Sequence, residues 1–171
     1  MPVCADEATK GHGLAGDFSD VMDKKMGNDK PDQGELLVVQ GKWDEAYKVY
    51  SKQIAARPGK ICVSARMQRM LCSSKLKHWQ QVIDDGTVIL NSKEGGVQVH
   101  SKVFERTGIA YAELKNYDRA CSCFNQELKL FPDSRQAFVQ LARCYKLAGH
   151  PKEAAAAQKK LDELDKDIQP F

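Results

Sequence analysis

One segment, residues 108–132, constrains the fold more than any other, because its apolar spacing predicts two amphipathic helices joined by a tight turn at Lys115 and Asn116. Pro132 ends the unit, since a proline inside a helix loses a backbone hydrogen bond and clashes with the preceding turn. We therefore predict a helical hairpin. Its apolar faces carry Phe104, Gly108, Tyr111 and Leu114 on the first helix and Ala120, Phe124 and Leu128 on the second.

The same hairpin pattern occurs four times along the chain. The residue that follows each turn is Trp43, Trp79, Tyr117 or Pro151, so successive copies lie 36, 38 and 34 residues apart. A single hairpin cannot bury its apolar face alone, whereas stacked hairpins share a continuous core. We therefore predict eight helices arranged as four stacked hairpins.

A helix–turn–helix repeat of about 34 residues that combines small and aromatic residues with a closing proline resembles the tetratricopeptide repeat. The resemblance covers about residues 28–165 and is fullest in the third copy. It implies an all-α fold, a right-handed superhelical solenoid of four repeats, and a role in protein binding. The third copy carries the pattern in Gly108, Tyr111, Tyr117, Ala120, Phe124 and Pro132.

Composition divides the chain into three parts. We expect residues 1–30 to form a flexible, acidic leader rich in glycine, residues 31–166 to carry the repeats, and residues 167–171 to form a loose tail. Residues 1–33 have a net charge of −3, whereas the remainder has +6. The leader also contains an apolar stripe at helical spacing, so it either caps the first repeat or docks as a short helix on the solenoid or a partner. The stripe consists of Leu14, Phe18, Val21, Met22 and Met26.

Several function classes have no support in the sequence. No stretch approaches the roughly 18–20 apolar residues of a membrane span, and the N-terminus lacks an apolar signal core, so we expect a cytoplasmic protein. The six cysteines show no C-x-x-C zinc spacing and are expected to be reduced thiols. None of the four histidines has a carboxylate or another ligand four residues away. We therefore expect no metal, no cofactor, no enzymatic activity and no specific nucleic-acid binding.

The second repeat departs most from the pattern. Ser73 and Gly86 stand where an aromatic side chain normally fills the space between helices. Gly86 inside a helix costs about 1 kcal/mol relative to alanine, so we expect this repeat to be the least stable. Gly86→Ala is expected to be neutral or stabilising if the site is an ordinary helix interior, and a large loss means that another helix packs there. Gly95 and Gly96 then predict a loop, and we expect repeat three to begin at Ser101.

In the resembled family the first helices of the repeats line a concave groove that holds the ligand. Lys102 and Arg106 look like half of the carboxylate clamp by which co-chaperone domains hold acidic C-terminal tails, and Gln68 replaces an asparagine of that clamp. Glu35 and Pro31 depart from the clamp pattern. The alternative is that Lys102 and Arg106 are only solvent-exposed charges on a helix face. Helical spacing and the resemblance together predict a peptide-binding set of Gln68, Lys75, Lys102, Arg106, Ile109, Arg143 and Lys146.

We therefore expect a non-enzymatic adaptor that binds a peptide or helix of acidic character in its concave groove, in a co-chaperone-like manner. The alternative is a structural subunit of a larger assembly, or a self-associating scaffold, that uses the convex face or the N-terminal leader.

Overall fold

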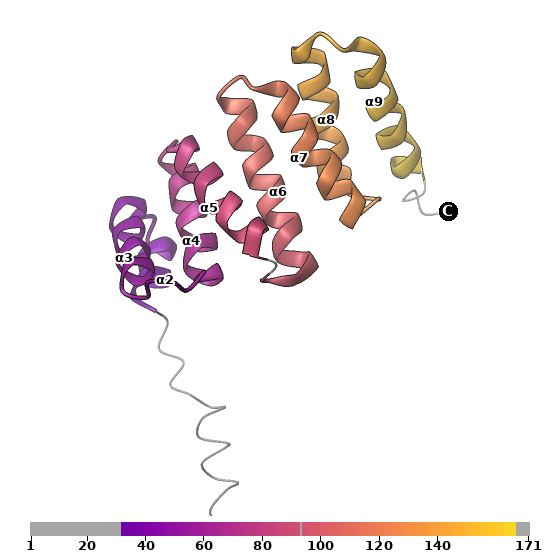
Figure 1. The fold of residues 1–171 in the computed structure, drawn as a ribbon. Helices are drawn as coiled ribbons and strands as arrows, with labels where there is room; N and C mark the ends of the chain where they lie inside the picture. The colour runs from indigo at the N-terminus through magenta and orange to yellow at the C-terminus, as the bar shows by residue number, and fades with distance from the viewer. Residues whose placement is uncertain (1–31, 93, 167–171) are drawn as a thin grey trace, which may run out of the picture. The chain divides into compact units, whose positions relative to one another are not determined.

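Eight α-helices follow one another along the described part of the chain in a computed structural model (Figure 1). The structure describes residues 32–92 and 94–166, and these ranges contain no β-strand. All eight helices belong to one compact unit. The predicted leader and tail lie outside the described residues. The helices are α2 (Gln33–Val39), α3 (Trp43–Ala55), α4 (Val63–Lys75), α5 (Trp79–Ser92), α6 (Gly96–Glu113), α7 (Tyr117–Leu130), α8 (Arg135–Ala148) and α9 (Pro151–Lys166).

Each hairpin turns at a residue with a positive φ angle, two residues before its second helix. These residues are Gly41 (φ 72°), Lys77 (60°), Lys115 (60°) and Gly149 (81°). Glycine adopts this left-handed conformation without a penalty, whereas the Cβ of a lysine is crowded there. The predicted turn at Lys115 and Asn116 is confirmed, and the same turn geometry recurs in all four repeats.

The four hairpins stack in chain order. Each helix contacts the next one along the chain, and the first helices of successive repeats also touch, α4 with α6 and α6 with α8. Within the described ranges no two second helices make comparable contacts. The first helices α4, α6 and α8 therefore form the inner layer of the stack, with the second helices outside them. The predicted all-α helical solenoid is confirmed.

In repeats one and three a glycine on the first helix lies against an aromatic ring on the second. A Cβ atom on Gly34 would lie 2.6 Å from Cζ of Tyr50, and one on Gly108 would lie 2.7 Å from Cε1 of Phe124. The rings fill the hairpin interior, since Tyr50 is 2% and Phe124 0% exposed. These two rings therefore fill the space between the helices of repeats one and three.

Repeat two places its large residue on the first helix instead. Met70 occupies the glycine position of α4, and Gly86 occupies the ring position of α5. A Cβ atom on Gly86 would lie 3.3 Å from Cε of Met70 and 3.2 Å from Cγ1 of Val103, and it would collide with Oγ1 of Thr107 on α6. Gly86 is therefore not an ordinary helix interior. Another helix packs against its backbone, so we now expect Gly86→Ala to destabilise the protein.

Repeat two also contains a buried ion cluster that the sequence pattern did not predict. Asp85 is fully buried, and its Oδ1 accepts hydrogen bonds of 2.6 Å from Nη1 of Arg66 and from Nη2 of Arg69. Its Oδ2 accepts a third, of 2.7 Å, from Nε of Arg69. Nη1 of Arg69 donates to Oγ of Ser51 on α3 at 3.2 Å, so the cluster also joins repeat two to repeat one.

Helix α6 begins at Gly96, five residues before the predicted start of repeat three at Ser101. Gly95 and Gly96 have φ angles of 97° and 68° and turn the chain into the helix, so the predicted loop is shorter than expected. Val99, in the added turn, packs against the core of repeat two. Burial of this apolar side chain explains why the helix extends beyond the repeat pattern.

Helix α9 ends the described stack and is mostly exposed, as expected for a terminal element. Ala157 is its only buried residue. Its charged side chains pair along the helix surface, for example Nζ of Lys160 with Oε2 of Glu163 at 2.6 Å. Across the described ranges, no helix combines the length and the apolar character that a membrane crossing requires.

Candidate functional site

The predicted peptide-binding residues all lie on α4, α6 and α8, in the inner layer of the stack. We call these seven residues, together with Val139 of α8, the inner surface. They differ in exposure, and therefore in their capacity to meet a ligand. Lys75, Lys102, Arg143 and Lys146 are exposed, whereas Gln68, Arg106 and Ile109 are half-buried.

Lys102 and Arg106, one turn apart on α6, each have a partner within the molecule. Nζ of Lys102 donates to Oε2 of Glu105 at 2.8 Å, and Nη1 of Arg106 donates to the backbone carbonyl of Met67 on α4 at 2.7 Å. Burial lowers the pKa of the Arg106 guanidinium, and the charge of Glu105 acts in the opposite direction. Exposed ion pairs are weak, so Lys102 can rearrange, whereas Arg106 ties α6 to α4.

Repeat two contributes less to the inner surface than expected. Arg69, which follows Gln68 in the clamp-like pair, binds Asp85, and this hydrogen bond is the main reason that the pKa of Arg69 is raised. Nζ of Lys75 lies 5.7 Å from the centroid of the Trp43 ring, at cation–π distance. Arg69 is therefore engaged inside the stack, whereas Lys75 is exposed and contacts a ring of repeat one. Glu35 is exposed on α2, and Pro31 lies outside the described residues.

Helix α8 presents the least engaged cations of the inner surface. Arg143 and Lys146 are exposed, and neither forms an ion pair with another residue in the described ranges. Val139, one turn before Arg143, is 43% exposed. The exposed face of α8 thus offers an apolar contact beside two cations.

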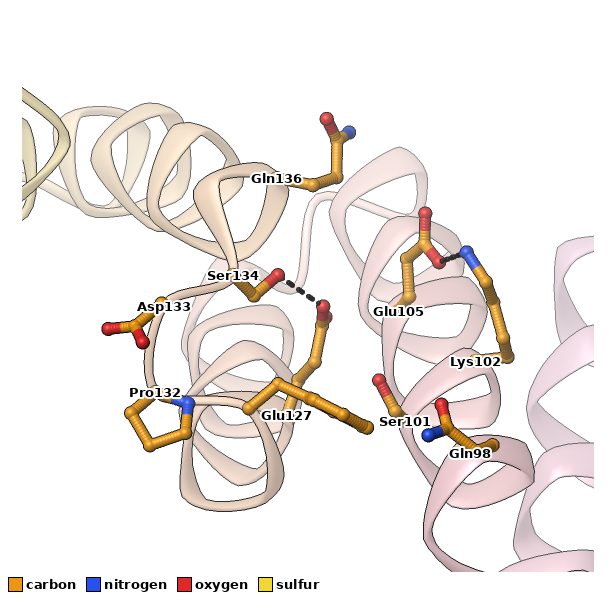
Figure 2. A pocket seen from close by; sticks show the side chains of 10 residues that line it. Gln98, Ser101, Lys102, Glu105, Glu127, Pro132, Asp133, Ser134 and Gln136 are labelled. Atoms are coloured by element: carbon orange, nitrogen blue, oxygen red, sulfur yellow. Dashed lines mark hydrogen bonds and ion pairs between the residues drawn. The ribbon is translucent and has the colours of Figure 1, made fainter. Parts of the chain in front are cut away.

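A cavity of about 620 Å³ lies between the start of α6, the end of α7 and the start of α8 (Figure 2). We call it the Glu127 cavity. Three of its lining residues carry carboxylates, and one carries an ammonium group. It is lined by Gln98, Ser101, Lys102, Glu105, Glu127, Phe131, Pro132, Asp133, Ser134 and Gln136.

Glu127 is only 4% exposed although it is a carboxylate. Its Oε1 accepts a hydrogen bond of 2.8 Å from Oγ of Ser134, and that Oγ in turn accepts from the backbone N–H of Ala137 and caps α8. Its buried Oε2 has no hydrogen-bond partner among the described residues. Burial raises the pKa of the Glu127 carboxyl, the bond from Ser134 lowers it, and the charge of Glu105 raises it further.

Sequence reasoning missed the Glu127 cavity, although one signal was present. Glu127 follows Phe124 by three residues, which places it on the apolar face of α7. An acidic residue on such a face is unusual, because burying an unpaired charge is costly. The position of the carboxylate could therefore be predicted from the sequence, but the cavity beside it depends on how α6 and α8 pack together.

The titratable side chains outside these sites are engaged by burial or by contacts with neighbouring residues. Burial raises the pKa of Cys121 to about 12 and that of Cys123 to about 11, so both thiols stay protonated near neutral pH. The ring of His78 packs edge-on against Tyr47, and Nε2 of His150 lies 3.6 Å from Oδ1 of Asp118. Within the described ranges, no cluster of His, Cys, Asp and Glu side chains could hold a metal ion.

Comparison with known proteins identifies the repeat. Residues 103–134 and residues 136–168 each match the tetratricopeptide repeat family, so α6/α7 and α8/α9 are each one repeat. A search of curated protein sequences found no significant match.

Several solved structures share the fold. MamA of Desulfovibrio magneticus RS-1 superposes with a TM-score of 0.71 at 17% identity, over 80% of this chain and 74% of that one. MamA MSR-1 superposes with a TM-score of 0.69 at 20% identity, over 87% and 86% of the two chains. MamA AMB-1 gives 0.66 at 22% identity, over 80% and 71%. At these identities the likeness concerns the fold alone. Residues 103–134 and 136–168 are thus tetratricopeptide repeats, and the four stacked hairpins share the fold of these structures. Together these findings support a tetratricopeptide repeat protein with a role in protein interaction or scaffolding.

Proposed function

We propose that this chain is an adaptor that binds a peptide or helix of a partner protein on its inner surface. The observation that carries the proposal is the composition of the exposed face of α8. There Val139 is exposed beside Arg143 and Lys146, two cations without an ion pair in the described part of the chain. Exposed cations without an ion pair attract a segment of opposite charge, and Val139 adds an apolar contact beside them.

These cations favour a partner segment with acidic residues. A hydrogen bond between a charged donor and a carboxylate contributes about 1.5–3 kcal/mol, and an arginine can bind the carboxylate with two parallel bonds. Arg143 is the best candidate for that role, because Arg106 already donates to the carbonyl of Met67. Lys102 joins the surface if it leaves Glu105 for the ligand.

Peptide selection tests this function without knowledge of the partner. A display library of random 12-residue peptides is selected against the wild-type protein, against Arg143→Glu/Lys146→Glu, and against the control Lys48→Glu/Lys52→Glu. The control removes two exposed lysines from the outer helix α3. We expect acidic peptides to be enriched on the wild type and the control, and to be lost on the inner-surface variant.

Two further outcomes refine or reject the proposal. The co-chaperone-like form of the function requires a C-terminal carboxylate, so amidation of the selected peptides should then abolish binding. If both double variants retain the same peptides, the inner surface is not the binding site. If no peptide is enriched and light scattering shows concentration-dependent association, the protein is a self-associating scaffold instead.

The expected compartment is the cytoplasm. The five cysteines in the described ranges are free thiols, and three of them, Cys72, Cys121 and Cys144, are buried. Buried free cysteines behave as small apolar residues and suit a reducing environment.

A further inference from the structure

We propose that the Glu127 cavity is a binding site for a basic side chain, the guanidinium of an arginine or the ammonium of a lysine, supplied by a protein segment. The inference deepens and rests on the proposed function, because the cavity shares Lys102 with the inner surface. The cavity adds a second contact to the proposed function. It binds a positive charge of the partner, whereas Arg143 and Lys146 bind a negative one.

The first argument is the unsatisfied oxygen of Glu127. The carboxylate is 4% exposed, and only Oε1 has a hydrogen-bond donor, the hydroxyl of Ser134. A buried carboxylate oxygen without a donor destabilises the ionised form, and burial accordingly raises the pKa of this group. A cation that enters the cavity supplies the missing counter-charge, and it supplies the missing donor when the Glu127 carboxylate turns toward it.

The second argument is the balance of charge around the cavity. Glu127 projects from α7 toward Ser134 on the side that faces α6, and Glu105 on α6 turns its carboxylate to Lys102 (Figure 2). The Asp133 side chain points away from α6 at the rim (Figure 2). Lys102 is the only cation among the lining residues, and its ammonium is bound to Glu105. Two carboxylates therefore share one internal cation, so the cavity is short of positive charge.

The third argument is space. A cavity of about 620 Å³ falls within the range of about 300–1,000 Å³ that is usual for ligand sites, and it far exceeds the room that one water molecule needs. Phe131 also lines it and can contact the aliphatic part of a long side chain. Arginine and lysine combine such an aliphatic part with a terminal cation, which matches this lining.

The two anchors set a spacing for the partner segment. Gln136, at the cavity, and Arg143, on the inner surface, are seven residues apart on α8, or about 10 Å along the helix axis. An extended peptide spans that distance in about three residues. We therefore expect a partner whose basic residue precedes or follows an acidic residue at about that separation.

Short peptides test the cavity without the full partner. The 15N-labelled full-length protein is titrated with acetyl-Gly-Arg-Gly-amide, with its lysine counterpart, and with the citrulline peptide, which keeps the shape of arginine but carries no charge. We expect the arginine peptide to shift the amide resonances of Ser101, Lys102 and Ser134, and the citrulline peptide to leave them unchanged. The lysine peptide distinguishes general cation binding from guanidinium recognition.

Glu127→Gln is the decisive variant. A glutamine side chain keeps an oxygen that accepts from Ser134 and removes only the charge, so the cap of α8 is preserved. We expect affinity for the arginine peptide to fall at least about tenfold, equivalent to about 1.4 kcal/mol. The control Glu45→Gln removes an exposed carboxylate on α3, outside the lining, and should leave affinity unchanged.

Lys102→Gln separates the cavity from the proposed function. It removes the only cation of the lining, so the arginine peptide should bind more tightly, whereas an acidic peptide on the inner surface should bind less tightly. Equal binding of the arginine and citrulline peptides, an unchanged affinity of Glu127→Gln, or no shift from the arginine peptide at millimolar concentration would overturn the inference. None of these results would affect the peptide selection on Arg143 and Lys146.

Discussion

Repeats two and three fill the same space between two helices in opposite ways. In repeat three Gly108 of α6 receives the ring of Phe124 from α7. In repeat two Met70 of α4 supplies the volume, and Gly86 of α5 is the small residue. The exchange leaves the backbone of α5 open to the next repeat, where Thr107 packs against it.

The difference shows that the two repeats keep one large and one small residue between their helices, although the large residue lies on a different helix in each. Interiors are close-packed, so a large and a small residue can exchange helices if their sum still fills the gap. Repeat two then differs in a second respect. Its outer helix carries the buried Asp85, which two arginines of α4 neutralise. The equivalent positions of repeat three hold Cys123, Phe104 and Thr107, and they form no ion cluster.

Phe124→Ala should give the largest effect, because it empties the centre of repeat three. The ring is fully buried, and truncation of such a ring typically costs about 3–5 kcal/mol of unfolding free energy. Urea denaturation followed by circular dichroism measures the change. Since Gly108 cannot collapse into the void, a loss below about 1 kcal/mol would contradict the packing described for repeat three.

Asp85→Asn should break the ion cluster of repeat two. The change leaves Arg66 and Arg69 without their counter-charge, and removing one partner of a buried pair costs about 3–5 kcal/mol. Both arginines keep some contact with solvent, so we expect a smaller loss, of about 2–3 kcal/mol. Asp84→Asn, at the exposed neighbouring position, is the matched control and should change the unfolding free energy by less than about 0.5 kcal/mol.

Gly86→Ala should destabilise repeat two by about 1–2 kcal/mol, because the new methyl group collides with Thr107. Removing the obstacle should reverse part of that loss, so Gly86→Ala in a Thr107→Ala background should cost less. A double-mutant cycle from urea midpoints measures the coupling. Additive effects would mean that α6 does not press on Gly86.

Replacing the turn lysines should give the smallest effect, and a favourable one. Lys77 of repeat two and Lys115 of repeat three hold φ angles of 60° at positions where repeats one and four have glycine. Lys77→Gly and Lys115→Gly should each raise the unfolding free energy by about 0.5–1 kcal/mol, since relief of the left-handed strain outweighs the extra freedom of glycine in the unfolded chain. Gly41→Ala is the reverse control and should lower the melting temperature.

The parts of the fold that follow from local pattern were predictable. The spacing of Trp43, Trp79, Tyr117 and Pro151 located all four hairpins, because helix periodicity and turn length depend on neighbouring residues. The exchange of Met70 and Gly86 was not predicted, since it becomes visible only when the equivalent positions of both helices are compared as a pair. The early start of α6 was missed because burial of Val99 depends on repeat two.

The candidate site was less predictable than the fold. Helical spacing placed Lys102, Arg106 and Arg143 on the inner layer, but it carried no information on their partners. Whether a cation is available depends on tertiary contacts, such as the bond from Arg106 to Met67 or the pairing of Arg69 with Asp85. The Glu127 cavity arises where three helices meet, so no single segment of sequence encodes it.

The stacking of each hairpin on its immediate neighbours has a consequence for how the chain is made. Contacting residues lie within about one repeat of each other, so little loop entropy opposes their meeting, and such topologies fold quickly. Domains begin to fold from the N-terminus during synthesis. The hairpin of α2 and α3 can therefore form while α8 and α9 are still being translated. Each new hairpin can then pack against the hairpin that was translated before it.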